Sequence, residues 1–202
     1  MDITWEQGGA IAIQLAMGIS LAACAGLRAF LPLFVVGLAG RFDVIPLTSS
    51  FDWLASTPAL IVFGVAVVFE LLADKIPLVD NFLDIVQTGV KPVAGTVLVA
   101  SVLTDLTPLQ SVVLGIVLGG GAAGIVHLLK AKLRFLSTAA SAGVGNPVLS
   151  VAEDSGALLG SLGAIFVPIL VFLVLVVFFV LAVLAIRRLR QGAPRAVTPI
   201  PH

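Results

Sequence analysis

The chain has 202 residues, of which 59% are hydrophobic and 11% are charged, and its mean hydropathy is +1.19. A soluble domain carries roughly 25% charged residues because water must wet its surface, so this composition excludes an ordinary soluble enzyme. The formal net charge is zero, which provides no basic field for nucleic acid. We therefore expect an integral membrane protein whose main partner is the lipid bilayer.

The segment Leu21–Cys24 resembles the cleavage box of a bacterial lipoprotein. The residues before it include Asp2 and Glu6 but no Lys or Arg, whereas a leader peptide begins with basic residues. We therefore expect this segment to be retained. Cys24 is the one cysteine of the chain, so an internal disulfide is excluded.

Seven apolar segments are expected to enter the bilayer, at residues 8–25, 29–41, 57–75, 89–104, 109–129, 144–163 and 164–186. They form three hairpins and a closing helix within one domain of residues 1–190, at 8–41, 57–104, 109–163 and 164–186. The fold class is therefore an all-α polytopic membrane bundle. Short segments such as 29–41 and 89–104 can be half-helices or re-entrant pieces, which need protein around them.

Basic residues predict the orientation of these segments. The closing helix ends in an Arg-rich cluster at 187–190, and Lys and Arg accumulate on the cytoplasmic side. We therefore expect a multi-pass protein of the inner (plasma) membrane with a cytoplasmic C-terminus, and a disordered tail at 191–202. Lys75 and the basic cluster 130–134 also fall inside in this arrangement. Residues 42–56 then form an outer loop.

Parts of the chain resemble one another. Phe69–Lys75 parallels Val126–Lys132, and Gly89–Val93 parallels Gly143–Val148. Gly26–Pro32 is a fainter third copy. We expect a duplication of the second and third hairpins and leave it open for the first. The alternative is that Gly and Pro are simply common in membrane helices.

Each copy places Gly and Pro around a polar residue where a helix would start. Pro suits the first turn of a helix, and a helix N-terminus exposes free N–H groups with a partial positive charge. Three such starts near the inner face would form an anion-binding floor. Arg28 and Lys91 would add formal charge, and Asn146 takes the polar position of the third copy.

Glu70 and His127 occupy equivalent places in two copies, each about one turn from the inner end of an apolar segment. Ionisable groups inside lipid are costly, so both are candidate functional residues. The alternative is that both side chains reach the inner surface, or that Glu70 pairs with Lys75.

The densest polar cluster is residues 80–87. If it is helical, Asp80, Asp84, Gln87 and Lys91 share one face at spacings of four, three and four residues. This face could line the entrance of a cavity, or it could be the wet side of an interfacial helix. Carboxylates here also suit hard cations, but no motif specifies a metal, and we expect none.

Glu153 and Asp154 lie midway along the segment 144–163. We expect at least one of them to face the bundle interior and contact a basic group, with Lys91 and Arg28 the favoured partners and His127 another. Adjacent residues point about 100° apart on a helix, so the second carboxylate should reach water or be protonated. The alternative is that 144–155 is a loop and only 156–186 crosses the membrane.

Several glycines are spaced for close helix packing, at Gly115, Gly119, Gly120, Gly121, Gly124, Gly156, Gly160 and Gly163. Such faces could also support a homo-oligomer. No nucleophile–base set, CxxC, HExxH or Walker pattern is present, so we expect neither an enzyme nor a cofactor.

Four stretches resemble a bacterial family of small membrane proteins catalogued as domain of unknown function four-one-two-six: Ala25–Pro32, Phe69–Pro77, Val79–Asn81 and Gly143–Pro147. The similarity spans residues 15–165, and Glu-Leu-Leu-Ala-Asp-Lys is its most specific motif. The resemblance implies a membrane location and assigns no catalytic residue.

From the polar residues at membrane depth, we expect a transporter or channel-like protein for a small anionic solute or a phosphate-bearing lipid headgroup. The alternative is a non-transporting membrane scaffold or assembly partner, in which the charges merely pair. A polar cavity that reaches the midplane would favour transport, and a dry closed core would favour the scaffold.

Overall fold

The computed structural model describes residues 5–73, 77–141 and 144–191 of the chain. The expectations for Lys75 at an inner boundary and for the tail after Gln191 lie outside these residues. The described chain is helical throughout its regular structure, which confirms the all-α fold class. Its elements are α1 (Trp5–Leu27), α2 (Phe30–Arg41), the 3₁₀-helix η1 (Ser49–Ala55), α3 (Thr57–Ala73), α4 (Pro77–Val102), α5 (Pro108–Leu114), the π-helix η2 (Gly115–Gly120), α6 (Gly121–Ser141), α7 (Asn146–Phe166) and α8 (Pro168–Gln191).

Four helical stretches are long and apolar enough to cross a membrane, at Trp5–Leu27, Ile85–Val102, Pro108–Ala140 and Asn146–Phe166. The bent pair of η1 and α3 can supply a fifth. Two shorter apolar helices, Phe30–Arg41 and Pro168–Leu184, complete the set. The chain is therefore a membrane protein, and its spans agree broadly with the seven expected segments.

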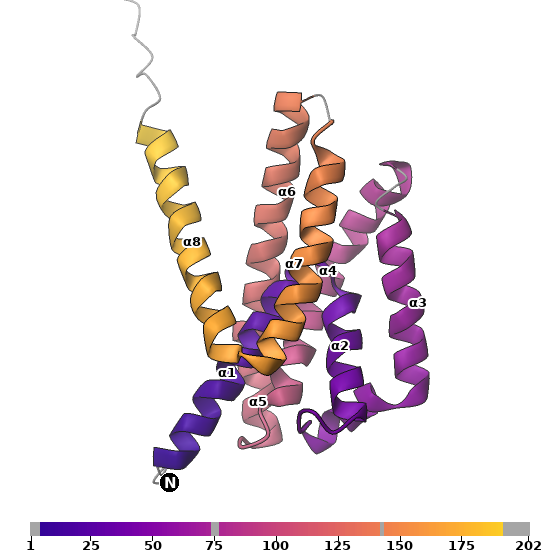
Figure 1. Ribbon diagram of the computed structural model, residues 1–202, viewed down its shortest axis with the longest axis vertical. Helices are drawn as coiled ribbons and strands as arrows, with labels where there is room; N and C mark the ends of the chain where they lie inside the picture. The colour runs from indigo at the N-terminus through magenta and orange to yellow at the C-terminus, as the bar shows by residue number, and fades with distance from the viewer. Residues whose placement is uncertain (1–4, 74–76, 142–143, 192–202) are drawn as a thin grey trace, which may run out of the picture. The chain divides into compact units, whose positions relative to one another are not determined.

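The chain divides into two compact units, Met1–Phe172 and Leu173–His202. In the first unit, α1 packs on α4, α6 and α7, and α2 packs on α3. Figure 1 shows these helices as successive hairpins, with α1 and α2 joined by a very short turn. The described part of the second unit is the remainder of α8, whose apolar side chains are largely exposed.

Two expected boundaries were wrong because the helices are longer than their apolar stretches. A membrane segment was expected to start at Gly89, but α4 begins at Pro77 and continues through Pro92 to Val102. The polar segment before Gly89 therefore belongs to the same helix. Similarly, the helix expected to end at residue 129 continues to Ser141.

The loop interpretation of residues 144–155 is also wrong, because α7 begins at Asn146. Pro147 occupies its first turn, where the missing N–H is harmless. Helix α5 likewise starts with a local signal, a capping box in which Thr107 and Gln110 bond each other's backbone N–H groups.

Glycines bring α4 and η2 into backbone contact. A β-carbon on Gly115 would lie 2.6 Å from the carbonyl oxygen of Thr96, and one on Gly119 would collide with the carbonyl oxygen of Gly95. A β-carbon on Gly26 of α1 would lie 2.6 Å from the carbonyl oxygen of Ala123. The expected glycine packing is thus present at Gly115 and Gly119, inside the chain. We call this region, where α1, α4 and η2 meet, the glycine crossing.

The π-helix keeps one buried stripe facing the bundle. Buried residues recur every four positions at Ser111, Gly115, Gly119, Ala123 and His127. Four residues exceed one α-helical turn, so a straight α-helix would rotate this stripe by about 40° at each step. The wider turns of η2 absorb that rotation. As a result, α6 presents His127 and then Lys130 to the bundle interior.

Candidate functional site, a buried ionic layer

Polar side chains from five segments gather around the turn between α1 and α2. We call this cluster the ionic layer, and it consists of Arg28, Glu70, Gln87, Lys91, His127, Lys130, Arg134, Ser150, Glu153 and Asp154. The most deeply buried cations are Arg28 and Lys91, which are 1% and 0% exposed. Burying such charges in a membrane protein is costly unless they are paired, so the layer is the candidate functional site.

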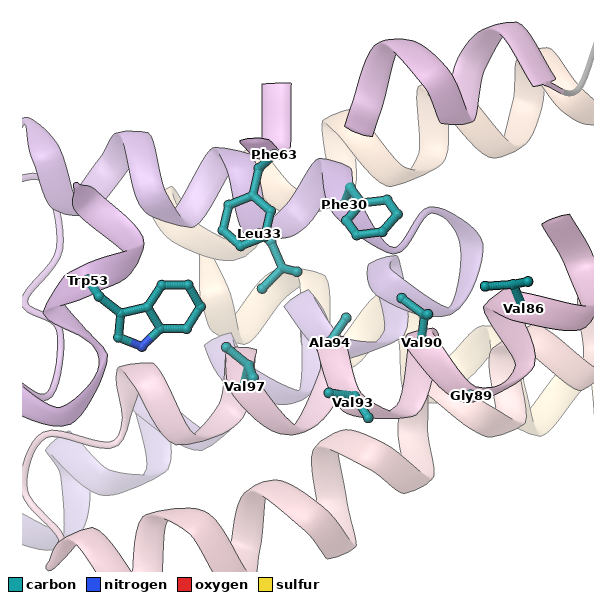
Figure 2. A pocket seen from close by; sticks show the side chains of 10 residues that line it. All are labelled: Phe30, Leu33, Trp53, Phe63, Val86, Gly89, Val90, Val93, Ala94 and Val97. Atoms are coloured by element: carbon teal, nitrogen blue, oxygen red, sulfur yellow. The ribbon is translucent and has the colours of Figure 1, made fainter. Parts of the chain in front are cut away.

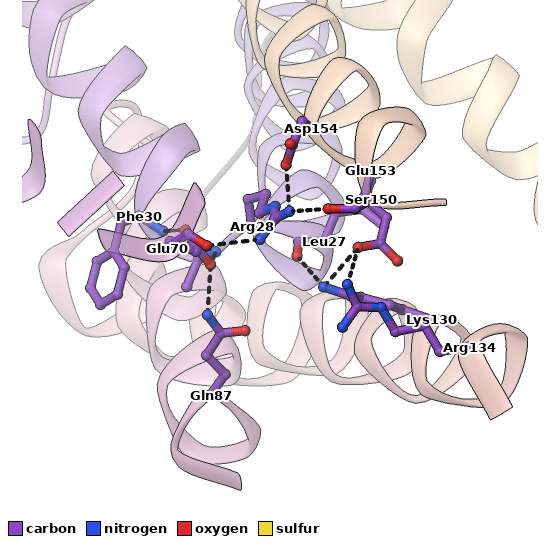
Figure 3. Close-up of polar contacts among 11 residues, drawn as sticks. Leu27, Arg28, Phe30, Glu70, Gln87, Lys130, Arg134, Ser150, Glu153 and Asp154 are labelled. Atoms are coloured by element: carbon purple, nitrogen blue, oxygen red, sulfur yellow. Dashed lines mark hydrogen bonds and ion pairs between the residues drawn. The ribbon is translucent and has the colours of Figure 1, made fainter. Parts of the chain in front are cut away.

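Arg28 joins α1 and α2 to two other helices. Its guanidinium donates a hydrogen bond to the backbone carbonyl oxygen of Glu70 at 3.3 Å and another to Ser150 Oγ at 3.2 Å. It also forms an ion pair with Asp154 of α7. Figure 3 shows the guanidinium between Glu70 and Asp154. The planar group suits several partners at once, which an ammonium cannot reproduce.

The Glu70 carboxylate caps the N-terminus of α2. Its Oε1 accepts a hydrogen bond from the backbone N–H of Ala29 at 2.8 Å, and its Oε2 accepts one from Phe30 at 3.2 Å. Gln87 of α4 donates a third bond, at 2.9 Å. A negative group satisfies the free N–H groups of a helix start and the partial positive charge there. Glu70 is 2% exposed, so the alternative in which its side chain reaches the inner surface was wrong.

A second pair of helices is joined by Glu153. Its Oε2 lies 2.9 Å from Lys130 Nζ and 3.7 Å from an Arg134 nitrogen. Lys130 Nζ also donates a hydrogen bond to the backbone carbonyl oxygen of Leu27 at 3.3 Å. The α6–α7 hairpin is therefore fastened to itself and to the end of α1 (Figure 3).

Lys91 contacts the imidazole of His127. The Lys91 Nζ and His127 Nδ1 atoms are 3.1 Å apart, and His127 Nε2 lies 3.2 Å from Thr88 Oγ1. His127 is 7% exposed, so it is held in the bundle and does not reach the surface. This contact links α4 to α6.

The ionic layer lies toward one end of the apolar part of the bundle. At 1.5 Å per residue, Glu70 is about 20 Å from the start of α3, Gln87 about 22 Å from the end of α4, and Lys130 about 33 Å from the start of α5. A bilayer core is about 30 Å thick. The layer is therefore near one boundary of the hydrocarbon, and α4, α6 and α7 continue beyond it.

The expectation for Glu153 and Asp154 was right about the inward contact with Arg28. It was wrong in expecting only one paired carboxylate, because Glu153 pairs with Lys130 and Arg134, while Asp154 is paired and also 33% exposed to water. The two adjacent carboxylates point apart on α7, and each has its own cationic partner, Arg28 for Asp154 and Lys130 for Glu153. The described contacts of Lys91 are with His127 rather than with this pair.

Asn146, another expected site residue, lies away from the layer. Asn146 donates a hydrogen bond to Thr138 Oγ1 at 3.0 Å, near the end of the α6–α7 hairpin. It lies eight residues before Asp154, or about 12 Å along α7. The side chains of Asp80 and Asp84 lie outside the described part of the chain.

The predicted anion-binding floor of three helix starts was also wrong. Gly89–Pro92 lies within α4 and starts no helix, and the first turn of α2 is already occupied by Glu70. The other two copies do begin helices as expected, α2 at Phe30 and α7 at Asn146. The internal duplication itself stays a prediction.

Lys130, Arg134, Gln87 and Ser150 were not among the expected binding residues. A sequence signal did exist for two of them, because His127, Lys130 and Arg134 recur at spacings of three and four residues and so share one face of α6. Because Lys130 and Arg134 were used only to place the inner membrane boundary, the helix face that they share with His127 was not predicted as part of the site. Within the described residues, no group of three His, Cys, Asp or Glu side chains could hold a metal ion.

Two apolar cavities, both open to the protein surface, begin at the first turn of α2. The first, of about 400 Å³, lies between α2, η1, α3 and α4 and is lined by Phe30, Leu33, Trp53, Phe63, Val86, Gly89, Val90, Val93, Ala94 and Val97. Figure 2 shows these side chains around the cavity. The second, of about 540 Å³, lies between α2, α3 and α7, and Leu31, Val67, Leu71, Leu158 and Leu162 are among its lining residues. Neighbouring residues of α2, Phe30 and Leu31, thus open onto different cavities.

Comparison with known proteins identifies one family. The model of the family described as Domain of unknown function (DUF4126) matches residues 15–188. No curated protein and no solved structure matches the chain.

Proposed function

For this chain, which belongs to the DUF4126 family, we propose transport of a phosphate-bearing molecule through the membrane, with a lipid phosphate as the favoured form. The observation that carries the proposal is the position of buried Arg28 just before α2, whose first residues Phe30 and Leu31 line two apolar cavities. A phosphate-bearing lipid needs both kinds of surface, one for its headgroup and one for its chains.

The cationic side of the site supports phosphate recognition. Arg28 presents a planar guanidinium, the group that best matches the paired oxygens of a phosphate. Lys91 and Lys130 add compact charges on neighbouring helices. These groups now bind carboxylates, carbonyl oxygens or imidazole inside the protein, so a phosphate would exchange with such partners during transport.

The apolar side supports a lipid rather than a free anion. Both cavities are bordered almost entirely by aliphatic and aromatic side chains, and both lie between helices that enter the membrane. In a bilayer, such spaces are filled by acyl chains, because water there would have no polar partners. A lipid could therefore place its phosphate near Arg28 and its chains beside α2.

The test uses purified protein in phosphatidylcholine vesicles that contain a fluorescent phosphatidylglycerol. We expect dithionite to quench the probe of both leaflets in the proteoliposomes. In empty vesicles it should quench only the probe of the outer leaflet. A second arm measures efflux of trapped inorganic phosphate. Loss of phosphate without lipid movement would identify the free anion as substrate instead. Activity in neither arm would contradict the transport proposal.

Arg28→Lys is the variant that links this activity to the site, and Arg41→Lys is its matched control. Arg41 is exposed and donates one hydrogen bond, to the carbonyl oxygen of Ala55 at 3.3 Å. We expect Arg28→Lys to lower lipid movement severalfold at equal reconstituted amounts, because Lys loses the fork geometry. Equal activity of the two variants would remove Arg28 from the mechanism.

The second candidate function is a membrane scaffold. It is favoured by the pairing of the carboxylates of Glu70, Glu153 and Asp154, which leaves the layer closed. A scaffold would leave both transport arms at the level of empty vesicles while the protein stays folded. The same two arms therefore separate the candidates.

We further propose that the protein lies in the inner membrane with its C-terminus in the cytoplasm. Arg187 and Arg188 at the end of α8 support this orientation. A C-terminal green fluorescent protein fusion should fluoresce, and a C-terminal alkaline phosphatase fusion should be inactive. Active phosphatase with a dark fluorescent fusion would reverse the orientation.

A further inference from the structure

Helix α3 is loosely attached to the rest of its unit. Its main packing partner is the short helix α2, with smaller contacts to η1 and α4. Among its described side chains only Glu70 and Ala73 are buried. Six large apolar side chains face outward, at Ile61, Val62, Val65, Val68, Phe69 and Leu72. An apolar helix with one inward charged residue depends on that residue for its position.

The start of α3 is built as a hinge. η1 and α3 meet at an angle of 61°, and Ser56 between them has extended backbone angles of φ −72° and ψ 149°. Two backbone N–H groups of α3 bond to Ser56, from Ala59 to its Oγ and from Leu60 to its carbonyl oxygen. The rings of Trp53 and Phe63, with centroids 6.2 Å apart, hold this end together. Movement of α3 would therefore increase toward the Glu70 end.

Both apolar cavities lie along α3. Phe63 borders the cavity next to α4, and Val67 and Leu71 border the cavity next to α7 (Figure 2 shows the first). Since these open spaces lie on both sides of the α2–α3 contact, α3 has few protein side chains to leave when it turns outward. Such movement would widen both cavities, which already open to the protein surface.

Glu70 fastens the far end of α3. Its carboxylate accepts bonds from Ala29, Phe30 and Gln87, and Arg28 bonds its backbone carbonyl oxygen. The charged groups that face it are Arg28 at the α1–α2 turn and Lys91 of α4. Arg28 is paired with Asp154 of α7, and Lys91 contacts His127 of α6.

We propose that α3 is a lateral gate that turns about Ser56 and is held shut by the Glu70 carboxylate. Opening separates Glu70 from the α1–α2 turn, uncovers the buried Arg28 and widens both cavities. The gate rests on the proposed function as the entry route for a lipid. Its movement, however, is a property of the protein alone and can be measured without any substrate.

The experiment measures distances between spin labels in a Cys24→Ala background, by double electron–electron resonance in nanodiscs. One label replaces the exposed Val68 on α3 and the other replaces the exposed Ile125 on α6. A reference pair at Ile13 on α1 and Ile125 reports on the rest of the unit. Comparison of the two pairs separates movement of α3 from general loosening.

Glu70→Gln is the main variant, because an amide has one acceptor oxygen where the carboxylate uses two. We expect a second population at longer distance for the α3 pair and no change for the reference pair. Gln87→Ala removes only one of the three bonds and should give a smaller population of the same kind. It serves as the second test if Glu70→Gln folds poorly.

Glu153→Gln is the matched control in the same ionic layer. Its partners Lys130 and Arg134 lie on α6, so the α3 distances should stay as in the parent. Unchanged distances in both Glu70→Gln and Gln87→Ala would overturn the gate. So would an equal shift of the reference pair. Because no lipid is assayed, these outcomes are independent of whether the vesicle test of transport succeeds.

Discussion

The ionic layer and the glycine crossing hold helices of the same bundle together by opposite means. In the glycine crossing, α4 and η2 touch through backbone atoms because Gly95, Gly115 and Gly119 lack side chains. In the ionic layer, long charged side chains span the space between α1, α6 and α7. Adding a side chain should destabilise the glycine crossing, whereas removing one charged partner should destabilise the ionic layer. Mutations can therefore distinguish them cleanly.

The largest expected effect is at the ionic layer, for Arg28→Ala. The substitution leaves Asp154 without its described ion-pair partner and removes the bonds to Ser150 and the Glu70 carbonyl oxygen. Breaking a fully buried pair by deleting one member costs about 3–5 kcal/mol, and the 33% exposure of the Asp154 side chain should bring the loss toward the lower end of that range. Thermal unfolding in detergent should show this loss, and Arg41→Ala should stay near the parent. Similar midpoints for the two variants would mean that the layer is solvated.

The next effect is at the glycine crossing, for Gly119→Val. A β-carbon there would meet the Gly95 carbonyl oxygen and approach Val99 Cγ2 to 2.8 Å, so α4 must move away. Overpacking of this kind costs about 1–3 kcal/mol. The control is Gly89→Val on α4, where nothing lies within 4 Å of a β-carbon. If both variants unfold at the same temperature, the crossing is not closely packed in the membrane.

The two regions should also differ in how mutations combine. Lys130→Met and Glu153→Gln remove two sides of one ion pair and should show a coupling energy of about 0.5–3 kcal/mol in a double-mutant cycle. Gly115→Ala combined with Glu153→Gln joins sites without a common partner, so their effects should add within about 0.5 kcal/mol. Strong coupling in the second cycle would show that the regions act as one unit.

Local chemistry made the fold class and several boundaries predictable. Apolar length predicted the membrane helices, Pro147 marked the start of α7, and the glycine spacing predicted close packing. The same reasoning failed at Gly89–Pro92, because a Gly and a Pro can end a helix or lie inside one. Tertiary packing decides between those outcomes, and a short pattern does not report it.

The candidate site was predictable residue by residue but not in its connections. The cost of charge in lipid selected Arg28, Glu70, His127, Lys91 and the Glu153–Asp154 pair. Which cation meets which carboxylate depends on the depth at which each helix crosses. Glu70 accepts bonds from Ala29 and Phe30, some forty residues earlier in the chain. A cap supplied by a distant helix has no signature in the sequence around α2, unlike the capping box of α5.

The smallest effect, and the one of opposite sign, is expected for Gly121→Ala. Gly121 follows Gly119 and Gly120 in the same run, yet nothing lies within 4 Å of a β-carbon placed there. It begins α6, where Ala is preferred to Gly by about 0.5–1 kcal/mol because Gly loses more backbone freedom on folding. The variant should therefore unfold at a slightly higher temperature than the parent, while Gly119→Ala unfolds lower. If Gly121→Ala is as damaging as Gly119→Ala, the whole Gly119–Gly121 run must be needed for packing, and the contact would extend past the glycine crossing.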